Sequence, residues 1–320
     1  MHNIKLGKEL ISIVVPVYKS VNSLKELVEQ VKSISFKNQL EFELIFVNDS
    51  PSFIATSNCL EKLCRKFSFV KHIKLRKNQG QHIAVVVGLL KATGKYIITM
   101  DDDLQHPVSE LNRLITIMDN NNKVDAIFAV SKNRNHNWWR NLGSRLLVKV
   151  DKLIDDVPDH LVKSSFRIMK KEIADAVCHN FGAMPSVSSL IIQYTHNIIN
   201  VEVAHNIRKY GSSNYNLRTL IKLSFNKIIN YSSLPLKVVG FIGFMFSIII
   251  IVFVGYTIAK KLVFGVSFPG YTSLVTIIGL LGSINLLAMG LVGEYLIRIL
   301  KEIQKPHLSE LIAEEYNFKV

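Results

Sequence analysis

Three consecutive aspartates, Asp101 to Asp103, end an apolar run and are followed closely by Gln105 and Pro107. Each ionised carboxylate raises the pKa of the next, so this crowding costs free energy unless a cation offsets it. A helix cap would use one aspartate, and Pro107 suits a helix start, but a cap does not explain three. Hard cations such as Mg²⁺ or Mn²⁺ prefer oxygen ligands of this kind. The pattern therefore predicts a metal site, with a solvated turn as the alternative.

The spacing of the aspartates indicates which of them would face the metal. Alternate side chains on an ideal strand point to the same face. Asp101 and Asp103 would then point inward together, with the amide of Gln105 two residues further on, and Asp102 would point away. We therefore expect the metal ligands to be Asp101, Asp103 and Gln105.

Short runs rich in β-branched residues alternate with amphipathic stretches over the N-terminal two thirds of the chain. We expect strands at 11–18, 41–49, 70–75, 95–101 and 124–130, and helices at 23–34, 60–67, 81–93 and 106–120. This alternation predicts an α/β fold with a mostly parallel, Rossmann-like sheet covered on both faces. Ligands of such sheets bind beyond the C-terminal ends of the strands, where Asp49 and the three aspartates fall.

The chain is basic, with 39 Lys and Arg residues, 25 Asp and Glu residues and a formal net charge of +14. That balance suits anionic lipid, phosphorylated substrates or nucleic acid. The basic residues form no recognisable nucleic-acid motif, so we expect no nucleic-acid partner. Cys59, Cys64 and Cys178 include no CxxC pair, which favours a reducing compartment. The apolar run at 11–17 lacks a signal-peptide pattern and is interpreted as a strand.

Charged residues are missing from 238–259 and again from 262–293. About 20 apolar residues cross the hydrocarbon core of a bilayer, so we predict transmembrane helices at 238–260 and 271–293, joined by a Pro-Gly break. Two buried core helices are the alternative. Lys and Arg residues are more frequent outside this hairpin than in its loop. The positive-inside rule then predicts a multi-pass protein of the cytoplasmic (inner) membrane, with both ends in the cytoplasm.

The remaining segments complete the expected organisation. Apolar residues at helical spacing, with Lys222 and Lys227 between them, predict an amphipathic interfacial helix at 216–237. This helix would join a cytoplasmic domain at 1–215 to the spans, and a cytoplasmic tail would follow at 294–320. Small residues such as Gly279 and Gly282 allow helices to pack closely in a membrane, so we expect a homo-oligomer.

Four segments, taken in order, resemble the polyprenyl-phosphate glycosyltransferases of glycosyltransferase family 2, a group that includes dolichol-phosphate mannose synthase and the bactoprenol glucosyltransferases. They are SIVVPVYKS, LIFVNDS, NQGQHIAVVVGLLKATGKYIITMDDDLQHP and RKYGSSNYNLRTLIKL. The resemblance implies a GT-A-type fold and an inverting, metal-dependent glycosyltransferase. It would move a sugar from a nucleotide sugar, with a UDP-sugar expected first, to polyprenyl (undecaprenyl) phosphate at the cytoplasmic face, for modification of cell-envelope glycans.

The resemblance also assigns roles on the donor side. Asp101, Asp103 and Gln105 match the family's metal and diphosphate positions, and Asn48 and Asp49 match positions that contact the base or ribose. Asp49 is alternatively a turn-forming residue of the sequence NDSP. Gly80 and Gln81 open a helix whose N-terminus suits anionic groups, although they are alternatively only a loop and a cap. The full nucleotide-side prediction is Pro16, Tyr18, Asn48, Asp49, Gly80, Gln81 and Asp102.

The acceptor is expected to meet cations, because arginine forks suit phosphate. Arg208 matches the family's arginine ahead of GxSxY, in which Ser213 and Tyr215 follow. Arg134 and Arg140 are further candidates, with a generic basic surface attracted to anionic lipid as the alternative. Many members carry an aspartate just before the FR pair that contains Arg167, whereas this chain has Ser165. The predicted lipid-phosphate residues are Arg134, Arg140, Ser165, Arg167, Ser213 and Tyr215, with Arg208 as a catalytic cation beside Asp101 and Asp103.

With serine at this position, the identity of a general base is undecided between Asp102 and Asp103. The reaction also needs no strong base, because an ionised phosphate monoester is already nucleophilic. Two other functions remain. A processive polysaccharide synthase would share the aspartates but should carry a QxxRW-type motif and more spans, and neither is found. The second alternative is a membrane-anchored, non-catalytic nucleotide-sugar binder. Ser165 favours this alternative, whereas the intact set of Asp101, Asp103 and Gln105 argues against it.

Overall fold

The computed structural model describes residues 9–38, 40–131, 158, 161–181, 186–204 and 270–317, with scattered positions between 240 and 263. The chain divides into two compact units, one formed by Met1–Asn214 with Lys305–Val320 and the other by Tyr215–Gln304. The C-terminal residues thus belong to the same unit as the N-terminal ones. This first unit contains the sheet and the candidate site.

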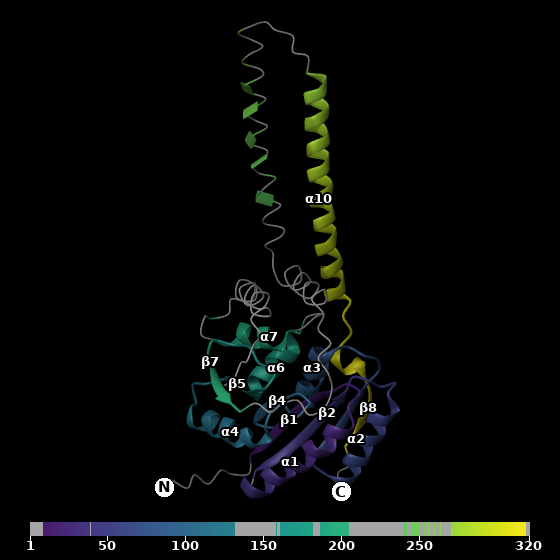
Figure 1. Ribbon diagram of the computed structural model, residues 1–320, viewed down its shortest axis with the longest axis vertical. Helices are drawn as coiled ribbons and strands as arrows, with labels where there is room; N and C mark the ends of the chain where they lie inside the picture. Colours follow the sequence, from purple (N-terminus) through teal and green to yellow (C-terminus); the bar gives the residue numbers. More distant parts are fainter. Residues whose placement is uncertain are drawn as a thin grey trace. The chain divides into compact units, whose positions relative to one another are not determined.

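The described residues of the first unit form an eight-stranded sheet in the order β7-β5-β6-β4-β1-β2-β3-β8 (Figure 1). β1 is parallel to β2 and β4, β2 to β3, and β5 to β7. β6 runs antiparallel between β4 and β5, and β8 antiparallel to β3. The strands are β1 (Leu10–Val17), β2 (Glu41–Asn48), β3 (Val70–Leu75), β4 (Tyr96–Thr99), β5 (Ala126–Ser131), β6 (Arg167–Lys170), β7 (Ile198–Val203) and β8 (Ile312–Tyr316).

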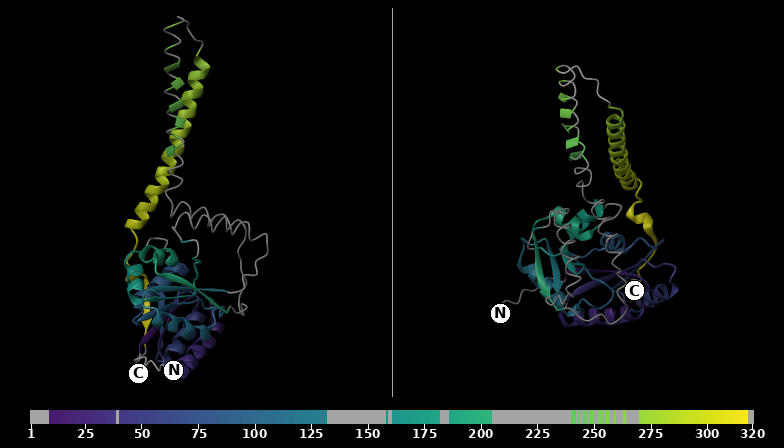
Figure 2. Two further views of the ribbon diagram at one scale, coloured as in Figure 1. Left: turned by 90° about the vertical axis from the view of Figure 1, so that its left-hand side faces the viewer. Right: turned by 45° about the horizontal axis from the view of Figure 1, so that its top comes forward.

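Helices cover both faces of this sheet, as the βαβ pattern predicts (Figures 1 and 2). Successive residues of β1 show why its sequence is apolar at nearly every position: Ile13 and Val15 enter one core, while Val14 enters the other. The first core is covered by α1 (Asn22–Asn38), α2 (Ile54–Lys66) and α4 (Leu111–Asn120), and the second by α3 (Gln81–Lys91), α6 (Lys171–His179) and α7 (Val187–Tyr194).

The order of the strands determines where a ligand can bind. The chain passes from β3 through α3 to β4, which lies on the far side of β1, so the winding reverses between β1 and β4. Open α/β sheets bind ligands at such a reversal, beyond the C-terminal ends of the strands. Tyr18 follows β1 and Asp101 follows β4 at this edge, and Asp49 follows the neighbouring β2. Sequence and topology therefore agree on the position of the site.

The C-terminal residues extend the sheet. The sequence indicates only a tail at 294–320, but residues 294–303 continue a helix and Ile312–Tyr316 form β8 along β3. Tyr316 stacks on the buried His72, with ring centroids 5.2 Å apart. Burial and the nearby Lys74 lower the pKa of His72 to about 4, so its imidazole is neutral. The alternation of β8 is too short, and its residues too polar, to be recognised as a strand from sequence.

Replacing Tyr316 with alanine should lower the free energy of unfolding by about 1 kcal/mol, because an aromatic pair of this kind is lost from the β3–β8 contact. Tyr316→Phe is the matched control: it keeps the stack and loses only the hydroxyl bond to the exposed Glu314. Urea unfolding of the full chain in detergent measures both. Equal stability of the two variants would contradict a role for the stack.

The second unit is described mainly through α10 (Tyr271–Ile303), a helix of 33 residues. It contains the stretch predicted at 271–293 and continues beyond it. Large apolar side chains along α10 are exposed, among them Ile278, Met289 and Ile303. Within the described part of the chain, no helix meets the combined length and apolarity needed to cross a membrane. The predicted interfacial helix at 216–237 lies outside the described residues, as does most of the stretch at 238–260.

Candidate active site

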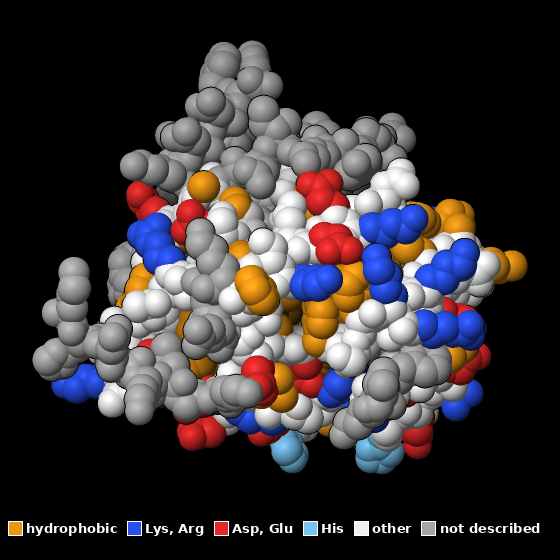
Figure 3. All heavy atoms as spheres, turned by 90° about the horizontal axis from the view of Figure 1, so that it is seen from below, with side chains coloured by type: hydrophobic (Ala, Val, Ile, Leu, Met, Phe, Trp, Pro, Cys, Tyr) orange, Lys and Arg blue, Asp and Glu red, His pale blue; other side chains and the backbone are white. Residues whose placement is uncertain are grey.

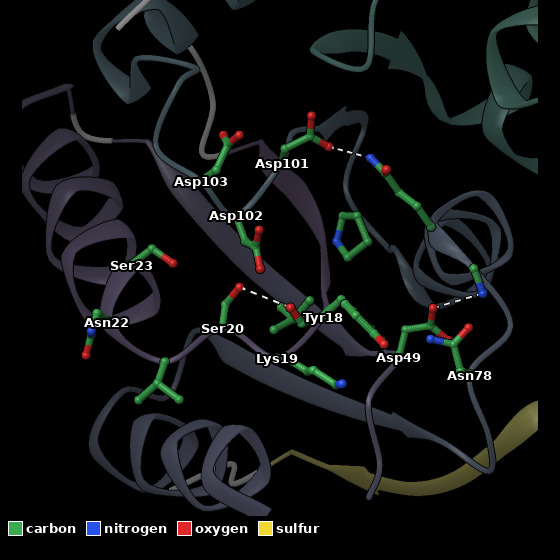
Figure 4. A pocket seen from close by; sticks show the side chains of 15 residues that line it. Tyr18, Lys19, Ser20, Asn22, Ser23, Asp49, Asn78, Asp101, Asp102 and Asp103 are labelled. Carbon is green, nitrogen blue, oxygen red and sulfur yellow. Dashed lines mark hydrogen bonds between the residues drawn. The ribbon is translucent and has the colours of Figure 1, made fainter. Parts of the chain in front are cut away.

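A cavity of about 650 Å³ lies at the edge of the sheet where β1, β2 and β4 end (Figure 4). Its walls come from the loop after β1, the residues after β2, the start of α3 and the three aspartates after β4. Six of the seven residues predicted on the nucleotide side and both predicted metal-binding aspartates thus meet in one pocket. The lining residues are Pro16, Val17, Tyr18, Lys19, Ser20, Val21, Asn22, Ser23, Asp49, Asn78, Gly80, Gln81, Asp101, Asp102 and Asp103.

Asp101 is held by donors on three sides. The Ser165 hydroxyl donates to Oδ2 over 2.8 Å, and Gln81 Nε2 donates to Oδ1 over 2.6 Å. His106 Nε2 lies 3.4 Å from the same Oδ2, and the His106 ring stacks on Phe166. Burial alone would raise the pKa of Asp101, but the bonds from His106 and Ser165 outweigh it and the pKa is lowered. Asp101 is therefore an ionised, oriented carboxylate.

Asp102 has a different environment. Burial raises its pKa to about 6, with the charges of Asp101 and Asp103 adding to the effect. In the described part of the chain, its Oδ2 is buried and has no hydrogen-bond partner. Figure 4 shows its side chain directed toward Ser20, within the pocket. A buried acceptor left in this state is a position where a ligand or cation would be stabilising.

The expectation that Asp102 points away from the site is wrong, because it lines the pocket. The argument assumed strand geometry, but β4 ends at Thr99 and the aspartates lie in a turn. Leu104, directly after the aspartates, has a φ of 62°, so the backbone stays irregular beyond them. Asp103 lines the same pocket, and its Oδ1 accepts the backbone N–H of Gln105 over 3.1 Å.

Replacing Asp102 with asparagine should stabilise the protein at pH 7.5 in the absence of divalent cations. A carboxyl group whose pKa is raised in the folded state stabilises folding fully below its unfolded pKa of 3.8, and this stabilisation is lost as the pH rises through about 6. The variant cannot ionise and should gain on the order of 2 kcal/mol at pH 7.5. The measurement is thermal unfolding with EDTA at several pH values, and the gain should vanish near pH 4. A gain that does not depend on pH would contradict the assignment.

Asn48 and Asp49 organise the loops around the pocket. Asn48 is fully buried, and its amide donates to Ser57 while its oxygen accepts from Ser50. The two carboxylate oxygens of Asp49 accept the backbone N–H groups of Gln79 and Gly80, over 2.6 and 2.9 Å. Asp49 lines the pocket and Asn48 does not. The local turn bond is made by Asn48, which accepts from the Ser50 N–H, whereas the Asp49 carboxylate binds the loop before α3, so the alternative of Asp49 as the turn-forming residue is wrong.

Ser165 and Arg167 lie behind Asp101. The buried guanidinium of Arg167 donates to the hydroxyls of Thr99 and Ser188, over 2.8 and 2.7 Å. Burial lowers the pKa of Arg167 to about 10, and the charge of Asp101 acts in the opposite direction. These residues border a small cavity of about 70 Å³ next to Asp101. They support the Asp101 carboxylate, and their predicted contact with a lipid phosphate stays a prediction.

Five predicted acceptor residues, Arg134, Arg140, Arg208, Ser213 and Tyr215, lie outside the described residues. Three other residues of the site were not found from sequence. Lys19 and Ser20 directly follow Tyr18, and His106 follows Gln105. Their proximity to residues already singled out was the available signal, but spacing alone does not show that they face the ligand.

The described residues include no group of three or more His, Cys, Asp and Glu side chains with the geometry of a metal site. Mg²⁺ in nucleotide sites, however, commonly takes one or two carboxylates and completes its shell with water and substrate phosphates. Asp101, with its lowered pKa, and Asp102, with its unpartnered oxygen, supply hard donors of that kind. The residues present thus fit a divalent cation that binds together with a phosphorylated ligand.

Comparison with known proteins decides the family. Residues 12–178 match the family model described as glycosyl transferase family 2. The chain belongs to glycosyl transferase family 2. Its α/β fold with a mixed sheet carries the aspartates of this glycosyltransferase at the strand ends.

Two curated relatives of this family 2 glycosyltransferase are similar over nearly its whole length. Both are named undecaprenyl-phosphate 4-deoxy-4-formamido-L-arabinose transferase. The protein from Proteus mirabilis (strain HI4320) is 28% identical over 301 residues, which are 92% of this chain and 90% of the relative. The protein from Pseudomonas syringae pv. syringae (strain B728a) is 28% identical over 298 residues, 92% of this chain and 88% of the relative.

One similar solved structure is glucosyl-3-phosphoglycerate synthase from Mycobacterium tuberculosis, in complex with Mn²⁺, UDP and phosphoglyceric acid. It is 14% identical to this chain, with a TM-score of 0.49, and the match covers 69% of this chain and 76% of that one.

Proposed function

We propose that this glycosyltransferase moves a sugar from a nucleotide-sugar donor, a UDP-sugar in the first instance, to undecaprenyl phosphate. The products would be a polyprenyl-phosphate sugar, for modification of cell-envelope glycans, and a nucleoside diphosphate. The observation that carries the proposal is the match to undecaprenyl-phosphate transferases over 92% of the chain, which extends well beyond the family model at residues 12–178. The pocket of carboxylates at the strand ends supports it.

The charges in the pocket support a requirement for Mg²⁺ or Mn²⁺. Four carboxylates line it, and Lys19 is the one Lys or Arg among its described lining residues. A nucleotide diphosphate entering this pocket would meet net negative charge, unless a cation enters with it. Asp101, Asp102 and Asp103 would hold that cation, and the amide of Gln105 follows them in the turn. When bound, the cation would neutralise the charge that develops on the departing diphosphate.

The acceptor phosphate would attack the anomeric carbon on the face opposite the leaving group, which inverts the configuration. A phosphate monoester is largely ionised near pH 7, so this chain needs to position it more than to deprotonate it. Arg208 is proposed to offset the charge of the attacking group, with Arg134, Arg140, Ser213 and Tyr215 around the lipid phosphate. Ser165 and Arg167 would keep Asp101 ionised and oriented during the transfer.

The proposed acceptor lies in a membrane, so the chain should be attached to one. We retain residues 238–260 and 271–293 as proposed spans on the basis of their uncharged sequence, with the catalytic domain on the cytoplasmic side. Packing through Gly279 and Gly282 would make a homo-oligomer. Figure 3 shows Lys and Arg side chains interspersed with acidic and apolar ones on one face of the molecule. The charges on this face are mixed in sign, so it does not present the purely basic patch that is typical of nucleic-acid binding.

A transfer assay tests the proposal. The full chain in detergent receives undecaprenyl phosphate, Mn²⁺ or Mg²⁺, and labelled nucleotide sugars, including a UDP-linked 4-deoxy-4-formamido-L-arabinose. Label should enter the organic phase with one donor, and EDTA or Asp103→Ala should abolish the transfer. Binding of nucleotide sugars without transfer from any of them would instead favour the membrane-anchored, non-catalytic binder. Label entering a long polysaccharide would favour the processive synthase.

A further inference from the structure

We propose that the buried guanidinium of Arg167 binds a carboxylate on the sugar of the donor, so that the preferred donor is a nucleotide-linked uronic acid. The inference rests on the proposed nucleotide-sugar donor and adds the chemical class of its sugar. Two observations carry it. Among the described residues, no carboxylate is bonded to this cation, and a small cavity of about 70 Å³ is lined by Arg167 together with residues of the donor pocket.

Arg167 places a positive charge in the interior of the first unit. It is 3% exposed, and its pKa of about 10 leaves it charged at neutral pH. A guanidinium has five N–H donors, so the bonds from Nε to Thr99 and from Nη1 to Ser188 leave donors for a further partner. Within the described part of the chain, Asp101 acts on Arg167 only through its charge. Buried charges are normally paired, so an anion beside Arg167 would be stabilising.

The hydroxyl groups around Arg167 direct their hydrogens elsewhere. Thr99 Oγ1 donates to the backbone carbonyl of Ser165 over 2.8 Å, and the Ser165 hydroxyl donates to Asp101. The Ser188 hydroxyl donates to a backbone carbonyl over 3.4 Å. These three hydroxyls therefore leave the guanidinium as the charged donor that a ligand in the cavity would meet. A carboxylate, which only accepts hydrogen bonds and carries the opposite charge, is complementary to it.

The small cavity adjoins the pocket proposed for the donor. Asp101 and Gln81 line both, and Gln81 Nε2 donates to Asp101 over 2.6 Å. Figure 4 shows Asp49, on the predicted nucleotide side, in a different part of the pocket from Asp101 and Asp103. A diphosphate at the aspartates carries its nucleoside at one end and its sugar at the other, so a nucleoside near Asp49 directs the sugar toward Asp101. About 10–15 Å³ already holds one water molecule, so this cavity has room for a carboxylate group.

The charge of Asp101 determines when a carboxylate can enter. The ionised Asp101 would repel a second carboxylate, and this repulsion is large in a poorly solvated site. A cation bound to Asp101 would offset that charge, and Arg167 would then be the nearby group that lacks an anion. A uronate is therefore expected to bind best together with the cation.

Binding calorimetry on the full chain in detergent with Mn²⁺ tests the proposal. The lipid is omitted, so that only the donor can supply the anion. UDP-glucuronate is compared with UDP-glucose, and UDP-galacturonate with UDP-galactose, because the members of each pair differ only in a carboxylate that replaces a hydroxymethyl group. Wild type should bind the uronate of at least one pair about tenfold more tightly, the ratio expected for a hydrogen bond between charged groups.

Ser188→Asp is the decisive variant, because it places a carboxylate of the chain itself beside the guanidinium of Arg167. It should lose the tenfold ratio through weaker binding of the uronate. Ser188→Asn is the matched control, since asparagine has the size of aspartate without its charge, and it should keep most of the ratio. Thermal unfolding separates lost contact from lost fold: Ser188→Asp should unfold at or above the temperature of Ser188→Asn, because it gains an ion pair with Arg167.

Four results would overturn the inference. If wild type binds both members of each pair equally, no carboxylate is recognised, and the proposed transfer is unaffected. If Ser188→Asp keeps the ratio, the carboxylate is bound elsewhere than at Arg167. If Ser188→Asn loses the ratio as fully as Ser188→Asp, the cavity selects by size and not by charge. If wild type binds none of the four donors, the proposed UDP-sugar donor fails together with the inference.

Discussion

Replacing Asp101 with asparagine is expected to reduce sugar transfer about a thousandfold or more, while leaving the protein folded. The carboxylate accepts bonds from Ser165 and Gln81, and these bonds hold it ready for a cation. Asparagine has the same shape but no charge, so the cation and the developing charge on the diphosphate lose their main fixed partner. The measurement is the initial rate of label transfer at saturating donor, with thermal unfolding measured alongside.

The matched control is Asp175→Asn on α6. It removes one carboxylate charge from an exposed ion pair with Lys171, outside the pocket, and should leave the rate unchanged. Transfer by Asp101→Asn within about tenfold of wild type would contradict the assignment of Asp101 to the reacting centre.

Replacing Gly94 with alanine is expected to destabilise the protein by about 2–4 kcal/mol. Gly94 lies between α3 and β4, and its N–H donates to the Ser12 hydroxyl over 2.8 Å. A Cβ atom at this position would lie 2.6 Å from the carbonyl oxygen of Leu10 and from the backbone nitrogen of Ser12. Backbone atoms within a central strand cannot move away cheaply, so β4 and the aspartates after it would shift.

Gly290→Ala on α10 serves as the control, because a Cβ there meets nothing within 4 Å and alanine favours a helix interior. Urea unfolding of the full chain in detergent compares the two variants. If Gly94→Ala unfolds at the wild-type urea concentration, the close approach of β1 to this loop is not as described.

The fold of the central sheet could be predicted because it depends on local patterns. Strands with alternate residues in two cores are rich in apolar residues, and β1 to β3 are found where their sequences indicate. β6 and β8 could not be predicted in the same way. Each has four or five residues and owes its place to pairing with a strand distant in sequence, β4 or β3. A pairing of that kind leaves almost no trace in a single sequence.

In the candidate site, too, some features could be predicted from sequence and others could not. The types and spacing of the aspartates indicated a cation, and the topology brings them to the β1–β4 reversal. The orientation of Asp102 could not be derived, because it depends on where β4 ends and the turn begins. The position of Lys19 in the pocket wall depends on a turn in which its φ is 56° and on a bond to Ser50, a residue contributed by another loop.

Ser165 stands where the family resemblance leads us to expect an aspartate, which raises the question of how the site works with a serine there. Its hydroxyl donates to Asp101, and its backbone carbonyl accepts from Thr99, which in turn accepts from Arg167. An aspartate in this place would set a second negative charge against Asp101 and raise its pKa. The serine therefore favours an ionised Asp101, at the cost of a candidate base that an ionised lipid phosphate does not require.

The most direct test of the account is a mass balance of the reaction. The full chain is incubated with undecaprenyl phosphate, Mn²⁺ and the donor selected in the transfer assay, and both products are quantified by mass spectrometry. We predict equal amounts of undecaprenyl-phosphate sugar and nucleoside diphosphate, with neither formed when the lipid or the cation is omitted. Release of nucleoside diphosphate without a lipid-linked sugar, or bound donor that remains intact, would contradict a polyprenyl-phosphate glycosyltransferase.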